Sequence, residues 1–359
     1  MLRKSLPALV LWLLAAALQA QAPAASRIDE ARRLAEALRQ EVKSPGLQAA
    51  VAVDGKVVWA EGFGEADAEG RVPVSPESRF RLGSVSKLFT IAAVARLAEA
   101  GRLDLDAPVQ RYVASFPEKD HPITARQLAG HLAGVRHYAP PDFMRPPKRY
   151  AQLVDGLEIF KDDPLLFPPG SKYFYTSYGY NLLGAVVEGA SGKDFWTTID
   201  EQVIRPLDLT ATGADDPERI VPGRVRFYAR DAEGNLKNER PIDSSYKWPS
   251  AGFLSSASDL VRFASAQVAD GYLKPETRTL LFTSMKTSAG EETGVGLGWR
   301  IATDAAGRRF YHHGGTIDGG RAFLLIYPEE KIAVALLANL SGARFAEGEA
   351  QKLAELFRN

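Results

Sequence analysis

The sequence predicts an α+β protein in which one antiparallel sheet, built from both ends of the chain and flanked by helices, carries an inserted, mostly helical lobe. Strand-forming runs occur near both ends, helix signals fill the region between them, and 45% of the 359 residues are hydrophobic. That composition provides enough apolar side chains for a large core. We expect the α/β lobe to span about 27–85 and 250–359, and the helical lobe about 86–249.

The opening segment has the order of a secretory signal. Arg3 and Lys4 precede the apolar stretch Leu6–Leu18, and small alanine residues follow it. This order predicts a signal peptide over residues 1–22, followed by one domain over residues 23–359. The apolar stretch is short for a membrane span, although an uncleaved anchor is the alternative. We therefore expect a periplasmic or secreted protein with no membrane span after signal cleavage.

Charge and cysteine content exclude several classes of function. The 44 basic residues equal the 44 acidic residues, so there is no electrostatic reason to expect nucleic acid as a partner. The chain has no cysteine, which excludes disulfides, thiol nucleophiles and cysteine-ligated metals. Its five histidines show none of the spacings typical of a zinc site. We expect no metal or organic cofactor.

The first elements are predicted from periodicity. Apolar residues at helical spacing predict an amphipathic helix over Arg27–Val42. Two β-rich runs, Leu47–Val53 and Lys56–Phe63, are joined at Asp54-Gly55, a pair typical of tight hairpins. An apolar run then predicts a buried helix over about Ser84–Ala100, which ends at a glycine.

The later elements follow the same rules. Helix signals recur at Thr124–His131 and Tyr178–Gly189, on either side of a proline-rich stretch. Near the end of the chain, four strands in a meander precede a closing helix over Arg344–Phe357. We place these strands at Gly296–Ile301, Arg309–His313, Arg321–Tyr327 and Lys331–Leu337.

The most informative motif is the spacing of Ser84 and Lys87. A serine and a lysine three residues apart lie one turn apart on the same face of a helix. The apolar run that follows would bury that face, and burial disfavours the charged ammonium, so the lysine can serve as a neutral base toward the serine hydroxyl. At a helix start the hydroxyl also lies near backbone N–H groups that can hold an oxyanion. The motif is short, and an ordinary solvated lysine is the alternative.

A second candidate is Tyr175, which is followed two residues later by Ser177. Both lie between a proline-containing loop and the helix predicted at Tyr178–Gly189, so they can face a cleft. A tyrosine there can transfer a proton if a nearby lysine stabilises its phenolate. The alternative is that it packs in the core with its hydroxyl hydrogen-bonded.

A third candidate is the run His312-His313-Gly314-Gly315, at the entry to the late strands. Consecutive glycines in a strand indicate close approach of a ligand or another segment, and a backbone N–H there can serve as an oxyanion donor. Adjacent histidines point to opposite faces of a strand and are poor joint ligands for one metal.

These three motifs, in this order, resemble those of the serine β-lactamase and penicillin-binding-protein superfamily, in its class C-like branch (peptidase S12). The family pattern is S-x-x-K, then Y-x-N or a variant, then K-T-G or H-x-G, whereas the G-x-S-x-G of α/β-hydrolases is absent. Segments 123–131 and 249–260 extend the resemblance to this family. Segments 134–138, 245–248 and 312–315 resemble those of mitochondrial serine β-lactamase-like proteins and their bacterial relatives. The resemblance implies a β-lactamase/transpeptidase-like fold.

The resemblance also implies roles for the matching residues. Ser84 would be the acylated nucleophile, and Lys87 its neighbouring base. Tyr175 would lie across the cleft and relay protons during acylation or deacylation.

The third motif has two registers. We prefer His312-His313-Gly314, which places His312 where the family has Lys or His, but His313-Gly314-Gly315 also fits. In the preferred register, the backbone N–H groups of Ser84 and Gly315 would form the oxyanion hole.

Two departures from the family pattern bear on the substrate. Ser177 replaces an asparagine that donates to the substrate amide carbonyl, and its hydroxyl reaches less far. His312 replaces a lysine whose charge meets the β-lactam carboxylate, and a mostly neutral imidazole attracts that carboxylate less. Both changes argue against an efficient β-lactamase and suit a peptidase or esterase.

The resulting hypothesis is an exported serine hydrolase that forms an acyl-enzyme on Ser84 and cleaves a small peptide, amide or ester. One alternative is a class C-like β-lactamase. Another is a non-catalytic, self-assembling scaffold that retains the fold. The sequence leaves open whether the chain forms a homo-oligomer.

Overall fold

The computed structural model describes residues 26–140, 142 and 148–358. The predicted signal peptide lies outside the described residues. The first described element is a helix over residues 26–41, which agrees with the helix predicted there.

The centre of the fold is a seven-stranded sheet in the order β3-β2-β1-β12-β11-β10-β9. Strand β1 pairs antiparallel with β12, from Leu47 opposite Ala338 to Val53 opposite Ile332. The two ends of the chain therefore form one sheet, as the sequence predicts. Its strands are β1 Gly46–Val53, β2 Lys56–Asp67, β3 Val72–Pro73, β9 Arg300–Thr303, β10 Arg309–Ile317, β11 Gly320–Tyr327 and β12 Ile332–Ala338.

The hairpin between β1 and β2 turns where predicted. Asp54 and Gly55 have φ of 50° and 76°, the left-handed conformation that a two-residue hairpin turn requires. Strand β9 differs from the prediction, because it begins at Arg300 rather than Gly296. The preceding residues turn back on themselves, with Gly296 N–H donating to Trp299 O at 2.9 Å.

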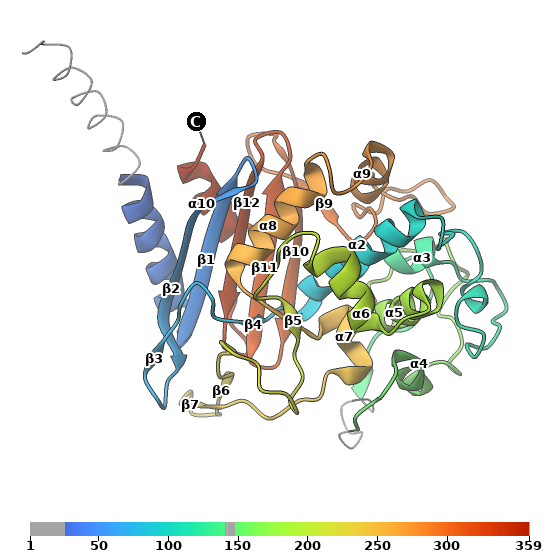
Figure 1. Cartoon of the computed structure of the whole chain (residues 1–359), viewed down its shortest axis with the longest axis horizontal. Helices are drawn as coiled ribbons and strands as arrows, with labels where there is room; N and C mark the ends of the chain where they lie inside the picture. Colours follow the sequence, from blue (N-terminus) through green and yellow to red (C-terminus); the bar gives the residue numbers. More distant parts are fainter. Residues whose placement is uncertain (1–25, 141, 143–147, 359) are drawn as a thin grey trace, which may run out of the picture.

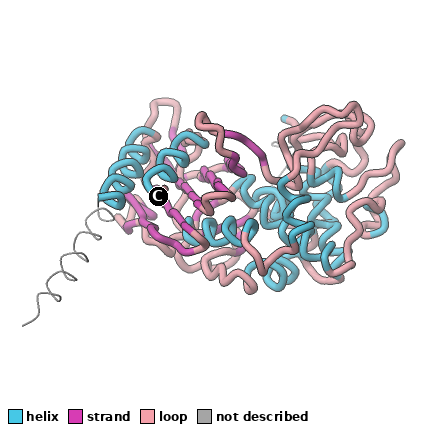
Figure 2. Tube along the Cα trace, turned by 90° about the horizontal axis from the view of Figure 1, so that it is seen from above, coloured by secondary structure: helices cyan, strands magenta, loops and turns pink. Residues whose placement is uncertain are grey.

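Helices cover both faces of the sheet (Figures 1 and 2). The helix over 26–41 and α10 (Glu347–Leu356) share one apolar core with the outer face of β10. Helix α8 (Ala257–Val268) packs on the other face, against β1, β11 and β12. That second core continues into the helical lobe.

The helical lobe lies to the right of the sheet in Figure 1, around the buried helix α2. Of the 14 residues in α2, 11 are buried, so the helix is enclosed on nearly all sides. The helices outside the sheet layers are α2 Ser86–Glu99, α3 Ala125–Ala129, α4 Leu153–Gly156, α5 Ser177–Ser191, α6 Phe195–Ile199, α7 Trp248–Ala251 and α9 Pro275–Phe282.

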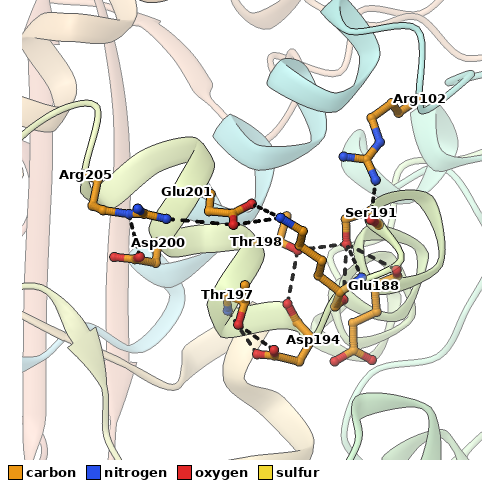
Figure 3. A network of polar contacts seen from close by, with 10 residues as sticks. Arg102, Glu188, Ser191, Asp194, Thr197, Thr198, Asp200, Glu201 and Arg205 are labelled. Atoms are coloured by element: carbon orange, nitrogen blue, oxygen red, sulfur yellow. Dashed lines mark hydrogen bonds and ion pairs between the residues drawn. The ribbon is translucent and has the colours of Figure 1, made fainter.

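Polar contacts fix the far end of α5 (Figure 3). Gly192 ends the helix in the left-handed conformation. The Ser191 hydroxyl accepts from Thr198 Oγ1 at 2.8 Å, and the Arg102 guanidinium donates to the Ser191 carbonyl. Because α5 is held there, its first residue, Ser177, has a defined position at the opposite end.

Short elements join the sheet to the lobe. Strand β8 (Phe253–Ser255) pairs with β4 (Phe80–Arg81) and with β5 (Gly213–Ala214), and β6 (Tyr228–Arg230) pairs with β7 (Leu236–Asn238). Among the residues that the structure describes, no helix combines the length and apolar character needed to cross a membrane.

Candidate active site

Ser84 lies in a single turn of 3-10 helix, η1 (Gly83–Val85), between β4 and α2. The turn is held at both ends, because Leu82 N–H donates to Phe253 O at 3.0 Å and Ser86 Oγ accepts from Phe253 N–H at 3.2 Å. The sequence predicts a helix over this motif, and the structure begins it with this tighter turn.

Glycines allow strand β10 to approach this turn closely. Gly83 has φ of 51°, and a Cβ there would lie 2.8 Å from the Thr316 backbone nitrogen. A Cβ on Gly315 would lie 1.9 Å from the Leu82 carbonyl oxygen. A side chain at either glycine would push β10 away from the serine.

Lys87 is completely buried on α2, one turn after Ser84. Its Nζ lies 3.1 Å from Ser84 Oγ, 3.1 Å from Ser177 Oγ and 3.0 Å from the Ser250 carbonyl oxygen. Burial lowers the pKa of Lys87, and the Arg300 charge acts in the same direction. A neutral amine can donate to Ser177 and Ser250 and keep its lone pair for the Ser84 hydroxyl proton.

Tyr175 lies across the same serine. Its hydroxyl donates to Ser84 Oγ at 2.7 Å. Burial alone would raise the pKa of Tyr175, but the Lys87 charge, hydrogen bonds to Lys87 and Ser84, and the Arg300 charge together lower it below the ordinary value. Ser84, Lys87 and Tyr175, predicted from separate motifs, thus form one hydrogen-bonded group.

Two histidines hold the segment that carries Tyr175. His131 Nδ1 accepts the Thr176 N–H at 3.2 Å, and His137 Nδ1 accepts the Ser177 N–H at 3.1 Å. The His131 ring also packs on Tyr175, with centroids 4.5 Å apart. The sequence favours a structural role for each of these histidines, and it does not show that the loop folds onto the start of α5.

The structure separates the two histidines of the third motif. The His313 ring lies 6.3 Å from that of Tyr175, whereas His312 points to the other face of β10 and stacks on Phe323 at 5.6 Å. The preferred register, with His312 in the site, is therefore wrong, and His313-Gly314-Gly315 is the register that fits. The reason is the alternation of side chains along a strand.

This correction also moves the predicted position of the second oxyanion donor by one residue. In the new register the position after the motif is Thr316 rather than Gly315. The Thr316 backbone nitrogen lies against Gly83, beside Ser84. Its side chain points to the outer face, where Thr316 Oγ1 accepts from Arg321 at 2.8 Å.

A cavity of about 550 Å³ opens in front of Ser84. Tyr175, Ser177 and His137 line it, together with residues of η6 (Ser245–Lys247), of α7 and of the turn after β10. Its walls combine aromatic, aliphatic and charged side chains. The lining residues include Tyr138, Tyr150, Tyr178, Tyr246, Ile159, Ile242, Ile317, Lys148, Arg240, Lys247, Asp243 and Asp318.

Two cations near the serine have no carboxylate partner within 4 Å among the described residues. The Arg300 guanidinium, on β9, lies 5.6 Å from the centre of the Tyr175 ring. Lys247 lines the cavity, and burial lowers its pKa to about 8. By contrast, Arg240 pairs with Asp318 at 2.9 Å. Because Lys247 lines the cavity, it favours an anionic or strongly polar ligand there.

With this geometry in place, comparisons identify the family. A family model described as Beta-lactamase matches residues 31–357. The chain belongs to the beta-lactamase family. The family assignment and the β-lactamase/transpeptidase-like fold predicted from the three motifs are both confirmed.

Similar proteins come from distant organisms. The mitochondrial serine beta-lactamase-like protein LACTB of Homo sapiens is 32% identical over 411 aligned residues, covering 87% of this chain and 75% of that protein. LACTB of Bos taurus is equally similar, with 74% of its length covered. The octameric penicillin-binding protein homologue from Pyrococcus abyssi is 27% identical, with a TM-score of 0.78 over 92% of this chain and 77% of that chain.

Proposed function

We propose that this protein is an exported serine hydrolase that cleaves peptide or amide bonds through an acyl-enzyme on Ser84 and also accepts esters. One observation carries the proposal: Ser84 Oγ lies 2.7 Å from the Tyr175 hydroxyl and 3.1 Å from Lys87 Nζ, at the wall of a cavity. A serine with two groups able to accept or donate protons is an activated nucleophile.

Acylation follows from these contacts. As Ser84 Oγ attacks the substrate carbonyl carbon, the neutral Lys87 amine accepts its proton, and the carbonyl oxygen becomes an oxyanion. The backbone N–H groups of Ser84 and Thr316 stabilise that charge. Tyr175 donates a proton to the leaving nitrogen or oxygen as the bond to it breaks.

Deacylation reverses the roles. Water attacks the acyl carbon, its proton passes to Tyr175, and Ser84 leaves with a proton from Lys87. The neutral forms of Lys87 and Tyr175 are thereby restored. The chemistry uses the chain's own groups, and the proposal includes no metal or organic cofactor.

The residue at the third motif disfavours efficient β-lactam hydrolysis. Burial, together with the Lys87 and Arg300 charges, lowers the pKa of His313 well below its ordinary value. His313 is therefore neutral at neutral pH and attracts a β-lactam carboxylate less than a lysine would. A peptide or ester substrate does not depend on that charge.

Export and assembly are part of the proposal. The Arg3, Lys4 and Leu6–Leu18 pattern supports a cleaved signal and a periplasmic or secreted protein. The LACTB relatives carry a mitochondrial location in their names, which differs from the export proposed for this chain. Homo-oligomer formation is supported by the octameric Pyrococcus abyssi homologue.

Intact-mass spectrometry tests the function. The protein is treated with a fluorophosphonate, then separately with penicillin, and Ser84→Ala serves as the control. We expect an adduct on the wild-type protein only, and a long-lived penicillin adduct rather than rapid turnover. A folded wild-type protein that gives no adduct with either reagent contradicts the hydrolase proposal and favours the scaffold. Rapid loss of the penicillin adduct favours the β-lactamase.

A further inference from the structure

We propose that the imidazole of His137 binds the substrate directly, donating from Nε2 to an amide carbonyl of the acyl group. The inference rests on the proposed function and narrows it to acyl groups that carry an amide near the scissile bond. His137 comes from the loop between α3 and α4, far in sequence from Ser84, and lines the same cavity.

The hydrogen bond at Nδ1 determines where the ring proton lies. The Ser177 backbone N–H can only donate, so His137 Nδ1, 3.1 Å away, must be the acceptor. Burial lowers the pKa of His137, which keeps the ring neutral at neutral pH. A neutral ring that accepts at Nδ1 carries its proton on Nε2.

That Nε2–H has no protein acceptor among the residues that the structure describes. Because the ring lines the cavity, the donor is available to a ligand there. Lys247 offers a charged group to the cavity, whereas His137 offers a neutral donor of fixed direction, suited to a carbonyl oxygen.

The ring is held in place on several sides. Tyr138 stacks on it, with centroids 4.7 Å apart, and Tyr175 meets it edge to face at 5.7 Å. The preceding residue, Arg136, pairs with Asp142 at 2.7 Å and with Asp163 at 2.5 Å. A donor fixed in this way loses little freedom when a substrate binds.

Ser177 is less suited to this role than His137, because its side chain is short and is held against Lys87. Ser177 Oγ accepts from Lys87 Nζ at 3.1 Å. Its backbone N–H is taken by His137. His137 therefore contacts Ser177 through Nδ1 and presents a neutral Nε2–H to the cavity that both residues line.

Two substitutions separate substrate binding from positioning. His137→Asn keeps an oxygen close to the Nδ1 position, able to accept the Ser177 N–H, but removes the donor at Nε2. His137→Gln keeps an amide N–H near the Nε2 position and loses the acceptor near Nδ1. The two variants therefore lose opposite halves of the imidazole.

The substrates are a matched pair of p-nitrophenyl esters, one of acetic acid and one of N-acetylglycine, which differ by the amide. If His137 donates to that amide, His137→Asn lowers kcat/KM for the N-acetylglycine ester about 10-fold or more relative to the acetate, and His137→Gln preserves the ratio. A ratio unchanged in His137→Asn, with both esters impaired equally in His137→Gln, would mean that His137 only positions Ser177 and would overturn the proposal.

Binding to Ser84→Ala protein gives a readout that needs no turnover. In this background we expect His137→Asn to raise the Kd of N-acetylglycine amide about 10-fold in calorimetry, and His137→Gln to raise it less. Equal affinity with and without His137→Asn contradicts the proposal. Absence of fluorophosphonate labelling on the wild-type protein contradicts the serine hydrolase function instead, so the two failures are distinguishable.

Discussion

The two faces of strand β10 carry the same residue types in the same order and have different surroundings. On the inner face, His313 lies near Tyr175, and Gly315 lies against the turn that carries Ser84. On the outer face, His312 and Gly314 lie against Phe323, in the core beneath the terminal helices. A shift of one residue exchanges every side chain between the two faces.

The comparison shows that strand register, rather than the local motif, decides which histidine is at the site. His313 pairs with Leu324, which belongs to the core shared with the helical lobe, and His312 pairs with Leu325, which belongs to the other core. The same pairing leaves little space for a side chain at Gly315 and more space at Gly314, and alanine substitutions can measure this difference.

The largest difference is expected between the two glycines. Gly315→Ala places a Cβ 1.9 Å from the Leu82 carbonyl oxygen, so β10 or the turn at Ser84 must move. We expect kcat/KM to fall about 100-fold, with a loss of about 1–3 kcal/mol in the free energy of unfolding. Ester hydrolysis and urea denaturation measure the two effects.

Gly314→Ala is the matched control. Its Cβ would lie 3.4 Å from the nearest atom of the Phe323 ring, close to ordinary contact. We expect stability to change by less than about 1 kcal/mol and activity to stay within about 2-fold. Equal damage from both alanines would contradict the assignment of the two faces.

The histidines give the next largest difference. His313 Nδ1 lies 2.7 Å from the Gly314 carbonyl oxygen, which fixes the ring beside Tyr175. We expect His313→Asn to lower kcat/KM about 10- to 100-fold, since general acid–base groups and their close neighbours have effects of this order. His312→Asn should leave kcat/KM within about 2-fold. The reverse pattern would restore the register centred on His312.

Local chemistry made the contact between Ser84 and Lys87 predictable. Ser84 and Lys87 are one helical turn apart, so their contact follows from spacing alone, and the apolar run after them predicts the burial that lowers the pKa of Lys87. The Asp54-Gly55 turn was equally local. These predictions required no knowledge of how distant segments meet.

What the sequence could not show depends on long-range contacts. The hydrogen bond from the Ser177 N–H to His137 joins residues 40 positions apart, and nothing in the local pattern marks it. The prediction placed the start of β9 at Gly296 rather than Arg300, because the segment of alternating glycines that includes Gly296 forms a turn instead of a strand. The resemblance in segment 134–138 was the available signal for His137.

The smallest expected effect is a pH dependence of stability from His312. Burial lowers the pKa of His312 to about 4, and its Nδ1 is buried without a hydrogen-bond partner among the described residues. In the unfolded chain a histidine titrates near its ordinary pKa of about 6.5. As the pH falls below that value, the unfolded state gains a proton that the folded state does not, so stability is lost toward acid.

Urea denaturation at about pH 7.5 and about pH 5.5 measures this contribution. Because the pKa of His312 is lower in the folded state than in the unfolded state, this residue should reduce the free energy of unfolding by about 1 kcal/mol between the two pH values. His312→Leu keeps an apolar side chain against Phe323 and has no proton to gain, so it should lose about 1 kcal/mol less than the wild type over this interval. An equal loss in both proteins would mean that His312 is already solvated, and that the outer face of β10 is more open to water than its packing indicates.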